Sequence, residues 1–306
     1  MNTTLDHALR PLTAHLSSAA MAIALMILTC PLVAQTSGQN LLRNGDAETG
    51  TSDGFVVKGG SLTVIPDAAS SGQHGFELTP SADGGDGAKA CQMVSTDLVP
   101  VDPSKTYQLS AMLQSAGSVE SQEVYLGLIP FDSGEKEIIA QSVNHLPGTE
   151  TELTEDVNKE GNILSIQKGD QWKAGPLLYV AFDVDDSGAF GDLPSRKLSG
   201  IGIDSVTDQG TYWEVQLTGK ARNSYPAGTK VRLHTAGGTY IYCGANNRKV
   251  PREWKEFKGT VTGVAQGRSD TQFWPGTSFV KVVLLPGRRA NEQLLVDDIT
   301  LKEVQP

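Results

Sequence analysis

The chain has 306 residues, of which 39% are hydrophobic, 6% aromatic and 20% charged, and its formal net charge is −10. This hydrophobic fraction is too high for a disordered chain, and the sequence shows neither a collagen repeat nor a heptad repeat. Nucleic acid is not expected as a partner, because proteins that bind a duplex usually carry a basic surface.

The N-terminal region contains an apolar stretch at residues 19–30, with Arg10 before it and the small residue Ala34 after it. The stretch is shorter than a membrane-spanning helix, which needs about 20 apolar residues. This order of features is typical of a secretory signal peptide. We therefore predict that residues 1–34 are removed, that the mature chain has no membrane span, and that it is secreted, periplasmic or on the cell surface. A membrane anchor is the alternative for this segment.

The rest of the chain reads as short strands separated by Gly, Pro, Asp and Ser. In one of these runs Tyr107, Leu109, Ala111 and Leu113 share a face, which is the pattern of a half-buried strand. Similar runs occur at residues 61–65, 124–131, 213–217, 239–242, 279–285 and 294–301. No helical stripe of comparable length is present, so we predict an all-β sandwich or barrel.

The two ends of the mature chain carry the most specific motifs. Residues 40–50 read NLLRNGDAETG and residues 294–301 read LLVDDITL. These motifs resemble the opening and closing motifs of CenC-type carbohydrate-binding modules (families 4, 9 and 22), although Ala47 stands where the family usually has Phe. Weaker motifs follow in the family's order at residues 69–72, 101–107 and 254–257. The resemblance implies a galactose-binding-like jelly roll.

The resemblance covers residues 40–145 and 236–304, with an unmatched segment between them. A domain of this kind is expected to need about 150 residues, so the chain is long enough to hold an insertion. We predict a discontinuous jelly-roll β-sandwich, residues 40–147 and 236–306, interrupted by an inserted small β-barrel-like module at residues 148–235. One long elaborated loop is the alternative, which such a length disfavours.

Four carboxylates are predicted to meet where the first and last strands lie side by side. These are Asp46 and Glu48 near the start and Asp297 and Asp298 near the end. Carboxylates that are close together repel each other unless a cation neutralises them, and Ca²⁺ prefers oxygen ligands. The resemblance implies a structural Ca²⁺ held by Glu48 and Asp297, with Asp46 and Asp298 assisting. The alternative is that these carboxylates simply face water.

The candidate ligand-binding residues are aromatic and cationic. Aromatic rings stack on the apolar faces of sugars, and planar polar groups bind their hydroxyls. On this basis we predict a sugar-binding cluster at Tyr240, Tyr242, Arg252, Trp254 and Trp274. Packing in the core is the alternative for each aromatic residue. Lysines at residues 249–258 add positive charge, which favours either a solvated face or contact with a sulfated or uronic acid polymer.

Two further features leave alternatives open. Cys91 and Cys243 remain in the mature chain, either as a disulfide or as two buried thiols. Residues 183–192 resemble a calcium loop, but Pro194 stands where a bidentate Glu is needed. We expect this segment to be a plain acidic turn.

No recognisable catalytic motif is present, neither a nucleophile elbow nor a zinc-protease helix nor a phosphate-binding loop. We therefore predict a secreted, noncatalytic carbohydrate-binding protein whose partner is an extracellular polysaccharide or oligosaccharide. Two alternatives remain. One is a structural or cell-surface interaction module, and the other is a jelly-roll polysaccharide lyase or other glycan-active enzyme.

Overall fold

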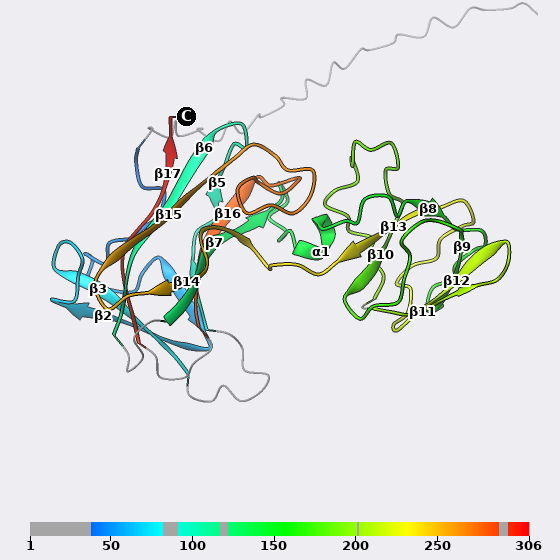
Figure 1. The fold of residues 1–306 in the computed structure, drawn as a ribbon. Helices are drawn as coiled ribbons and strands as arrows, with labels where there is room; N and C mark the ends of the chain where they lie inside the picture. The colour runs from blue at the N-terminus through cyan, green and yellow to red at the C-terminus, as the bar shows by residue number, and fades with distance from the viewer. Residues whose placement is uncertain (1–37, 82–90, 117–121, 201, 288–292, 306) are drawn as a thin grey trace, which may run out of the picture. The chain divides into compact units, whose positions relative to one another are not determined.

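The computed structural model describes residues 38–81, 91–116, 122–200, 202–287 and 293–305 (Figure 1). The predicted signal peptide, residues 1–34, lies outside these ranges. The described residues belong to one compact unit. Within the described ranges, no helix is both long enough and apolar enough to cross a membrane.

The first sheet has six strands, all paired antiparallel. Along most of each strand, alternate side chains point to opposite faces of the sheet. On β7, Leu126 and Leu128 are buried toward the second sheet, and Tyr125 and Ile129 point the other way. The strand order is β1 (Phe55–Lys58), β4 (Gln92–Ser95), β16 (Phe279–Pro286), β7 (Gln122–Phe131) and β14 (Ile241–Val250), with β5 (Val99–Pro100) also paired to β16.

The second sheet has five antiparallel strands. On β6 the four predicted inward residues, Tyr107, Leu109, Ala111 and Leu113, are each at most 1% exposed, so the predicted alternation is confirmed. The strand order is β15 (Lys255–Thr262), β6 (Thr106–Ser115), β17 (Leu294–Val304), β3 (His74–Pro80) and β2 (Gly60–Pro66).

The inward faces of the two sheets share one hydrophobic core. Leu128 and Val282 of the first sheet and Leu109 and Leu301 of the second belong to the same buried cluster. Each sheet thus removes one apolar face from water by packing against the other, which defines a β-sandwich. The predicted all-β sandwich is confirmed.

Both described cysteines are free thiols in this core. Cys91 is buried, and Cys243 packs against the same cluster. Burial disfavours the thiolate and raises the pKa of Cys91 to about 11 and that of Cys243 to about 12. Of the two alternatives for these residues, the structure shows the thiols.

The first and last segments of the chain within the sandwich lie side by side, as predicted. The backbone N–H of Leu41 donates to the carbonyl of Leu301 on β17 at 2.8 Å. The Asn40 side chain donates to the Ile299 carbonyl at 3.0 Å and accepts from the Leu301 N–H at 3.1 Å. A Cβ atom on Gly45 would lie 2.0 Å from the carbonyl oxygen of Ile299, so only glycine allows this approach. The opening motif is therefore held against the closing strand.

Residues 148–235 form two three-stranded sheets of their own. Isolated bridges pair Leu153 with Ile166 and Gly175 with Ile203, which links the two sheets into a barrel-like arrangement around a separate hydrophobic cluster. A single helical turn, α1 (Ala140–Val143), precedes them. In one sheet the strand order is β10 (Leu178–Phe182), β13 (Lys230–Thr235) and β8 (Thr151–Glu152). In the other it is β11 (Ile203–Asp208), β12 (Tyr212–Leu217) and β9 (Ile163–Gln167). The predicted domain boundaries stay a prediction.

Candidate functional site

Three tyrosines gather on the outward face of the first sheet, which we call the tyrosine face. Tyr125 lies on β7, Tyr242 on β14, and Tyr240 just before β14. The ring centroids of Tyr125 and Tyr242 are 5.0 Å apart, and those of Tyr240 and Tyr242 are 6.1 Å apart at 76°. Tyr240 and Tyr242 are 8% and 9% exposed, whereas Tyr125 is half-buried. Tyr125 therefore offers the most accessible ring of the three.

Polar groups surround the tyrosine face. Gln92 on β4 forms a hydrogen bond with the Tyr240 hydroxyl, and the negative charge of Glu137 also acts on that group. Lys281 on β16 is half-buried and projects outward, because its neighbours Val280 and Val282 belong to the core. Burial raises the pKa of Tyr240, so its hydroxyl stays protonated at neutral pH. The face thus combines apolar rings with hydrogen-bonding groups.

The predicted ligand-binding residues do not form one cluster. Tyr240 and Tyr242 lie on the tyrosine face. Arg252 is exposed and Trp254 half-buried on the turn that connects β14 to β15. Trp274 lies elsewhere again, in the core of the sandwich. The prediction grouped these residues because they are close in the sequence. In the structure, successive segments of the chain pass from one sheet to the other, so the residues are separated.

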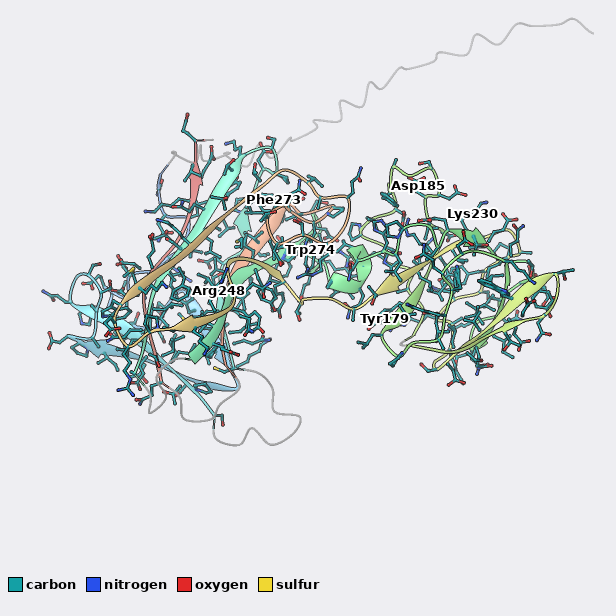
Figure 2. The ribbon with its side chains drawn as sticks, in the orientation of Figure 1. Tyr179, Asp185, Lys230, Arg248, Phe273 and Trp274 are labelled. Atoms are coloured by element: carbon teal, nitrogen blue, oxygen red, sulfur yellow. The ribbon has the colours of Figure 1, made fainter. Side chains whose placement is uncertain are left out.

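The prediction that Trp274 contacts a sugar is wrong. Its side chain is 0% exposed and belongs to the sandwich core (Figure 2). The indole N–H donates to the Ser269 carbonyl at 2.8 Å, so its polar atom is satisfied within the protein. The preceding residue, Phe273, packs edge-on against Tyr107 with centroids 5.8 Å apart. The turn-like sequence at residues 273–276 therefore covers the core.

The predicted calcium carboxylates bind the backbone of one loop. Glu48 Oε1 accepts from the backbone N–H groups of Gln73 at 2.8 Å and His74 at 2.9 Å. Asp297 is 0% exposed, and its Oδ2 accepts from the N–H groups of Ser70 at 2.8 Å and Ser71 at 3.1 Å. Both carboxylates thus hold residues 70–74 in place.

The remaining two acidic residues have local partners. Asp298 accepts from the Ser71 hydroxyl at 3.0 and 3.1 Å, and Asp46 accepts weakly from the Glu48 N–H at 3.4 Å. In the described ranges, no group of three or more His, Cys, Asp and Glu side chains is placed to share a metal ion. Asp297 and Glu48 therefore have hydrogen-bond partners within the protein, and these contacts do not depend on a metal.

The acidic segment 183–192 is a self-contained turn. Asp185 Oδ1 accepts from the Ser187 N–H at 3.0 Å and Asp185 Oδ2 from the Gly191 N–H at 2.8 Å (Figure 2). The hydrogen bonds with Ser187 and Gly191 lower the pKa of Asp185 to about 2. Asp192 accepts from the guanidinium of the buried Arg232 at 2.9 Å. These contacts give Asp185 and Asp192 partners within the protein.

A hollow also lies on residues 148–235, which we call the inserted segment. Trp172 and Trp213 line it together with Lys173 and Asp204, and its volume is about 580 Å³. The Trp172 indole N–H donates to the Thr149 carbonyl at 2.9 Å, and its ring belongs to the local core. Trp213 is only partly buried. The hollow therefore offers one partly exposed ring, that of Trp213, just as the tyrosine face offers that of Tyr125.

The most important residue that sequence reasoning missed is Tyr125. It lies in the predicted strand at residues 124–131, where Val124, Leu126 and Leu128 alternate with it. Applying the two-residue period to this run would have placed Tyr125 on the outward face. Its partner Tyr242 comes from a strand far along the chain, so only the sheet order shows that they meet.

The chain is similar in structure to carbohydrate-binding modules. The CBM22-1 xylan-binding domain from Paenibacillus barcinonensis Xyn10C has a TM-score of 0.40 and 11% identity, over 89% of this chain and 99% of that chain. TmCBM61 in complex with beta-1,4-galactotriose has a TM-score of 0.30 and 12% identity, over 87% and 99%. The enzymatically active domain of tailspike protein 4 from bacteriophage CBA120 has a TM-score of 0.37 and 7% identity, over 87% and 21%. No family model and no curated sequence matches.

Proposed function

We propose that this protein is an exported, noncatalytic carbohydrate-binding protein that recognises an extracellular polysaccharide through the tyrosine face. The observation that carries the proposal is the packing of Tyr125 against Tyr242 on the outward side of the first sheet. Such rings offer a rigid apolar surface to a sugar ring. Gln92, Glu137 and Lys281 supply amide, carboxylate and ammonium groups for its hydroxyls. Export is supported by the signal-peptide motif alone.

The noncatalytic part of the proposal is supported by the tyrosine hydroxyls. A tyrosine that removes a proton from a polysaccharide needs a lowered pKa. Burial instead raises the pKa of Tyr240 and that of Tyr242. These two hydroxyls are therefore poorly suited to act as the base of a lyase.

The test is affinity electrophoresis of the full chain in gels that contain xylan, β-glucan or β-1,4-galactan. Tyr125→Ala should weaken binding to the retarding polymer by about tenfold, the size expected for one aromatic contact. The matched control is Tyr212→Ala, which removes a partly buried tyrosine from β12 of the inserted segment. Equal loss in both variants, or retardation by none of the polymers, contradicts the proposal. New reducing or unsaturated ends in the polymer would favour the enzyme.

A structural Ca²⁺ at Glu48 and Asp297 stays a separate proposal. Its support is that both side chains hold the same loop, at Ser70 and His74. The hydrogen bonds to backbone N–H groups give an account of these carboxylates that needs no metal. Measurement of the thermal midpoint with calcium and with chelator distinguishes the two.

A further inference from the structure

The sandwich has a groove along the side where its two sheets end. β14 is an edge strand of the first sheet and β15 an edge strand of the second, and the two lie beside each other (Figure 1). They approach closely at Gly259, where a Cβ atom would lie 1.8 Å from the carbonyl oxygen of Cys243. Beyond this point the pairing of β14 with β7 is irregular between Ala245 and Arg248, and a hollow of about 680 Å³ opens between the edge strands.

The walls of this hollow are positively charged. Four exposed cations line it, which are Arg248 (Figure 2), Lys249, Lys255 and Lys258, and we call it the cationic groove. Lys258 pairs with Glu256, the one carboxylate of the lining, at 2.7 Å. Within the described ranges, Arg248, Lys249 and Lys255 have no carboxylate oxygen within 4.0 Å.

The groove differs from the rest of the surface in grouping several free cations. Some lysines elsewhere have carboxylate partners, such as Lys168 with Asp208 at 2.6 Å and Lys197 with Asp183, and others, such as Lys136 and Lys159, have none within 4.0 Å in the described ranges. With a net charge of −10, the chain offers many carboxylates that could approach a lone cation. Three neighbouring cations without such partners repel one another, so an anionic ligand would stabilise them.

The cationic groove also has apolar and amide groups that could contact a chain of sugars. Phe257 forms an apolar floor, and Lys255 Nζ lies 5.8 Å from the centre of its ring. Asn246 and Asn247 add exposed amides, and Asn246 donates to Asp270 at 3.2 Å. Phe257 is only 6% exposed, so it cannot stack on nucleic acid bases as single-strand binding requires. The groove therefore favours a polyanion with hydroxyl groups over one with flat bases.

We propose that the cationic groove is a second binding site, specific for a polyanionic glycan that carries carboxylate or sulfate groups. The groove includes Tyr242 of the tyrosine face, but it goes beyond that face because Lys255 and Lys258 lie on β15 of the second sheet. The ammonium and guanidinium groups would bind the recurring anionic groups of the polymer, and the asparagine amides its hydroxyls.

The test compares two triple variants of equal charge change. Arg248→Gln/Lys249→Gln/Lys255→Gln removes the free cations of the groove. The control, Lys168→Gln/Lys197→Gln/Lys220→Gln, removes three lysines that are paired on the inserted segment. Thermal midpoints of both are measured first, and Lys255→Gln alone replaces the groove triple if that variant does not fold.

Binding is measured to polygalacturonate, to a sulfated galactan, to neutral xylan and to single-stranded DNA, each at low salt and at high salt. The groove triple should lose about tenfold in affinity for one or both of the anionic glycans, and the control should lose much less. High salt should weaken the same interaction. Polygalacturonate and the sulfated galactan distinguish carboxylate from sulfate recognition.

Three results would overturn the proposal: no binding to either anionic glycan, equal loss in the two triple variants, or DNA bound as tightly as the glycans with the same loss. A neutral polymer that binds the wild type, and loses affinity in Tyr125→Ala but not in the groove triple, keeps the tyrosine face as a site of its own. Failure of one site is therefore distinguishable from failure of the other.

Discussion

The sandwich and the inserted segment enclose different kinds of side chain. The sandwich is built from long strands, such as β6 with 10 residues and β17 with 11, which bury whole apolar faces. The strands of the inserted segment have 2 to 6 residues. Alongside its apolar cluster, this segment encloses Arg232 and His234, both 0% exposed.

Contacts of the buried arginine tie the short strands to the acidic turn. Arg232 Nη2 donates to Asp192 at 2.9 Å, Nη1 donates weakly to the Asp185 carbonyl at 3.4 Å, and the guanidinium carbon lies 5.3 Å from the centre of the Phe190 ring. Arg232 Nε has no hydrogen-bond partner. The comparison teaches that the inserted segment places an ion pair beside its apolar cluster, whereas the fully buried carboxylate of the sandwich, Asp297, is satisfied by backbone N–H groups.

The strongest way to break the sandwich is to remove Trp274. Because the ring is fully buried, Trp274→Ala should leave a cavity and lower the free energy of unfolding by about 4 kcal/mol. Urea unfolding followed by circular dichroism measures this. Trp254→Ala, at a half-buried position, is the control and should cost clearly less. Near-equal losses would contradict the placement of Trp274 in the core.

The corresponding change in the inserted segment is the loss of Arg232. Arg232→Ala leaves the carboxylate of Asp192, which is 11% exposed, without its partner, and should cost about 3 kcal/mol. Adding Asp192→Asn should recover part of the loss, because it removes the unpaired charge. The two variants are compared by urea unfolding. If the double variant is less stable than Arg232→Ala, the ion pair does not explain the effect.

Acid should weaken the inserted segment through His234. Burial lowers its pKa to about 3, and its Nδ1 lies 2.7 Å from the Gln141 carbonyl. The unfolded chain binds this proton near pH 6.5, so the stabilising contribution is complete above that pH and is lost as the pH falls toward 3. Between pH 7 and pH 5 the loss should be roughly 2 kcal/mol.

The pH dependence has its own control. Arg232 and His145 face His234, and burial also lowers the pKa of His145, which adds to the same trend. Most of the slope between pH 7 and pH 5 should therefore disappear in His234→Gln, whatever the absolute stability of that variant. An unchanged slope would assign the acid sensitivity to other groups.

The sequence predicted the sandwich well because its signals are local or lie at the chain ends. The alternation from Tyr107 to Leu113 is a property of one strand, and the motifs at residues 40–50 and 294–301 identify neighbours without any knowledge of the loops. The gap between the two sets of motifs predicted a separate module at residues 148–235, and its boundaries stay a prediction.

The candidate site was harder to predict, because it depends on sheet order. Tyr125 and Tyr242 meet only because β14 pairs with β7, and no local pattern records that pairing. For Trp274, local sequence signals were present but misleading. Its turn-like neighbours, Pro275 and Gly276, suggest exposure, but the loop folds back so that Phe273 donates its N–H to the Gly263 carbonyl at 2.9 Å.

The smallest expected effect concerns the loop that joins the ends of the sandwich. Two backbone N–H groups, of His74 and Gln73, lower the pKa of Glu48, so its contribution to stability is present at neutral pH and is lost as the pH falls below 4.5. Glu48→Gln keeps an oxygen that can accept these N–H groups but removes the charge that a cation needs. The thermal midpoint of this variant should be slightly lower at pH 7, and the difference from wild type should shrink at low pH.

Melting curves with and without calcium distinguish a metal site in this loop from hydrogen bonding alone. If Glu48 and Asp297 bind Ca²⁺, the ion should raise the thermal midpoint of the wild type by mass action and should leave Glu48→Gln unchanged. A wild-type melting curve that is the same in calcium and in chelator would contradict the metal site. Glu48 and Asp297 would then serve only as acceptors for the N–H groups of residues 70–74, and the motifs at the two ends would act here through hydrogen bonds alone.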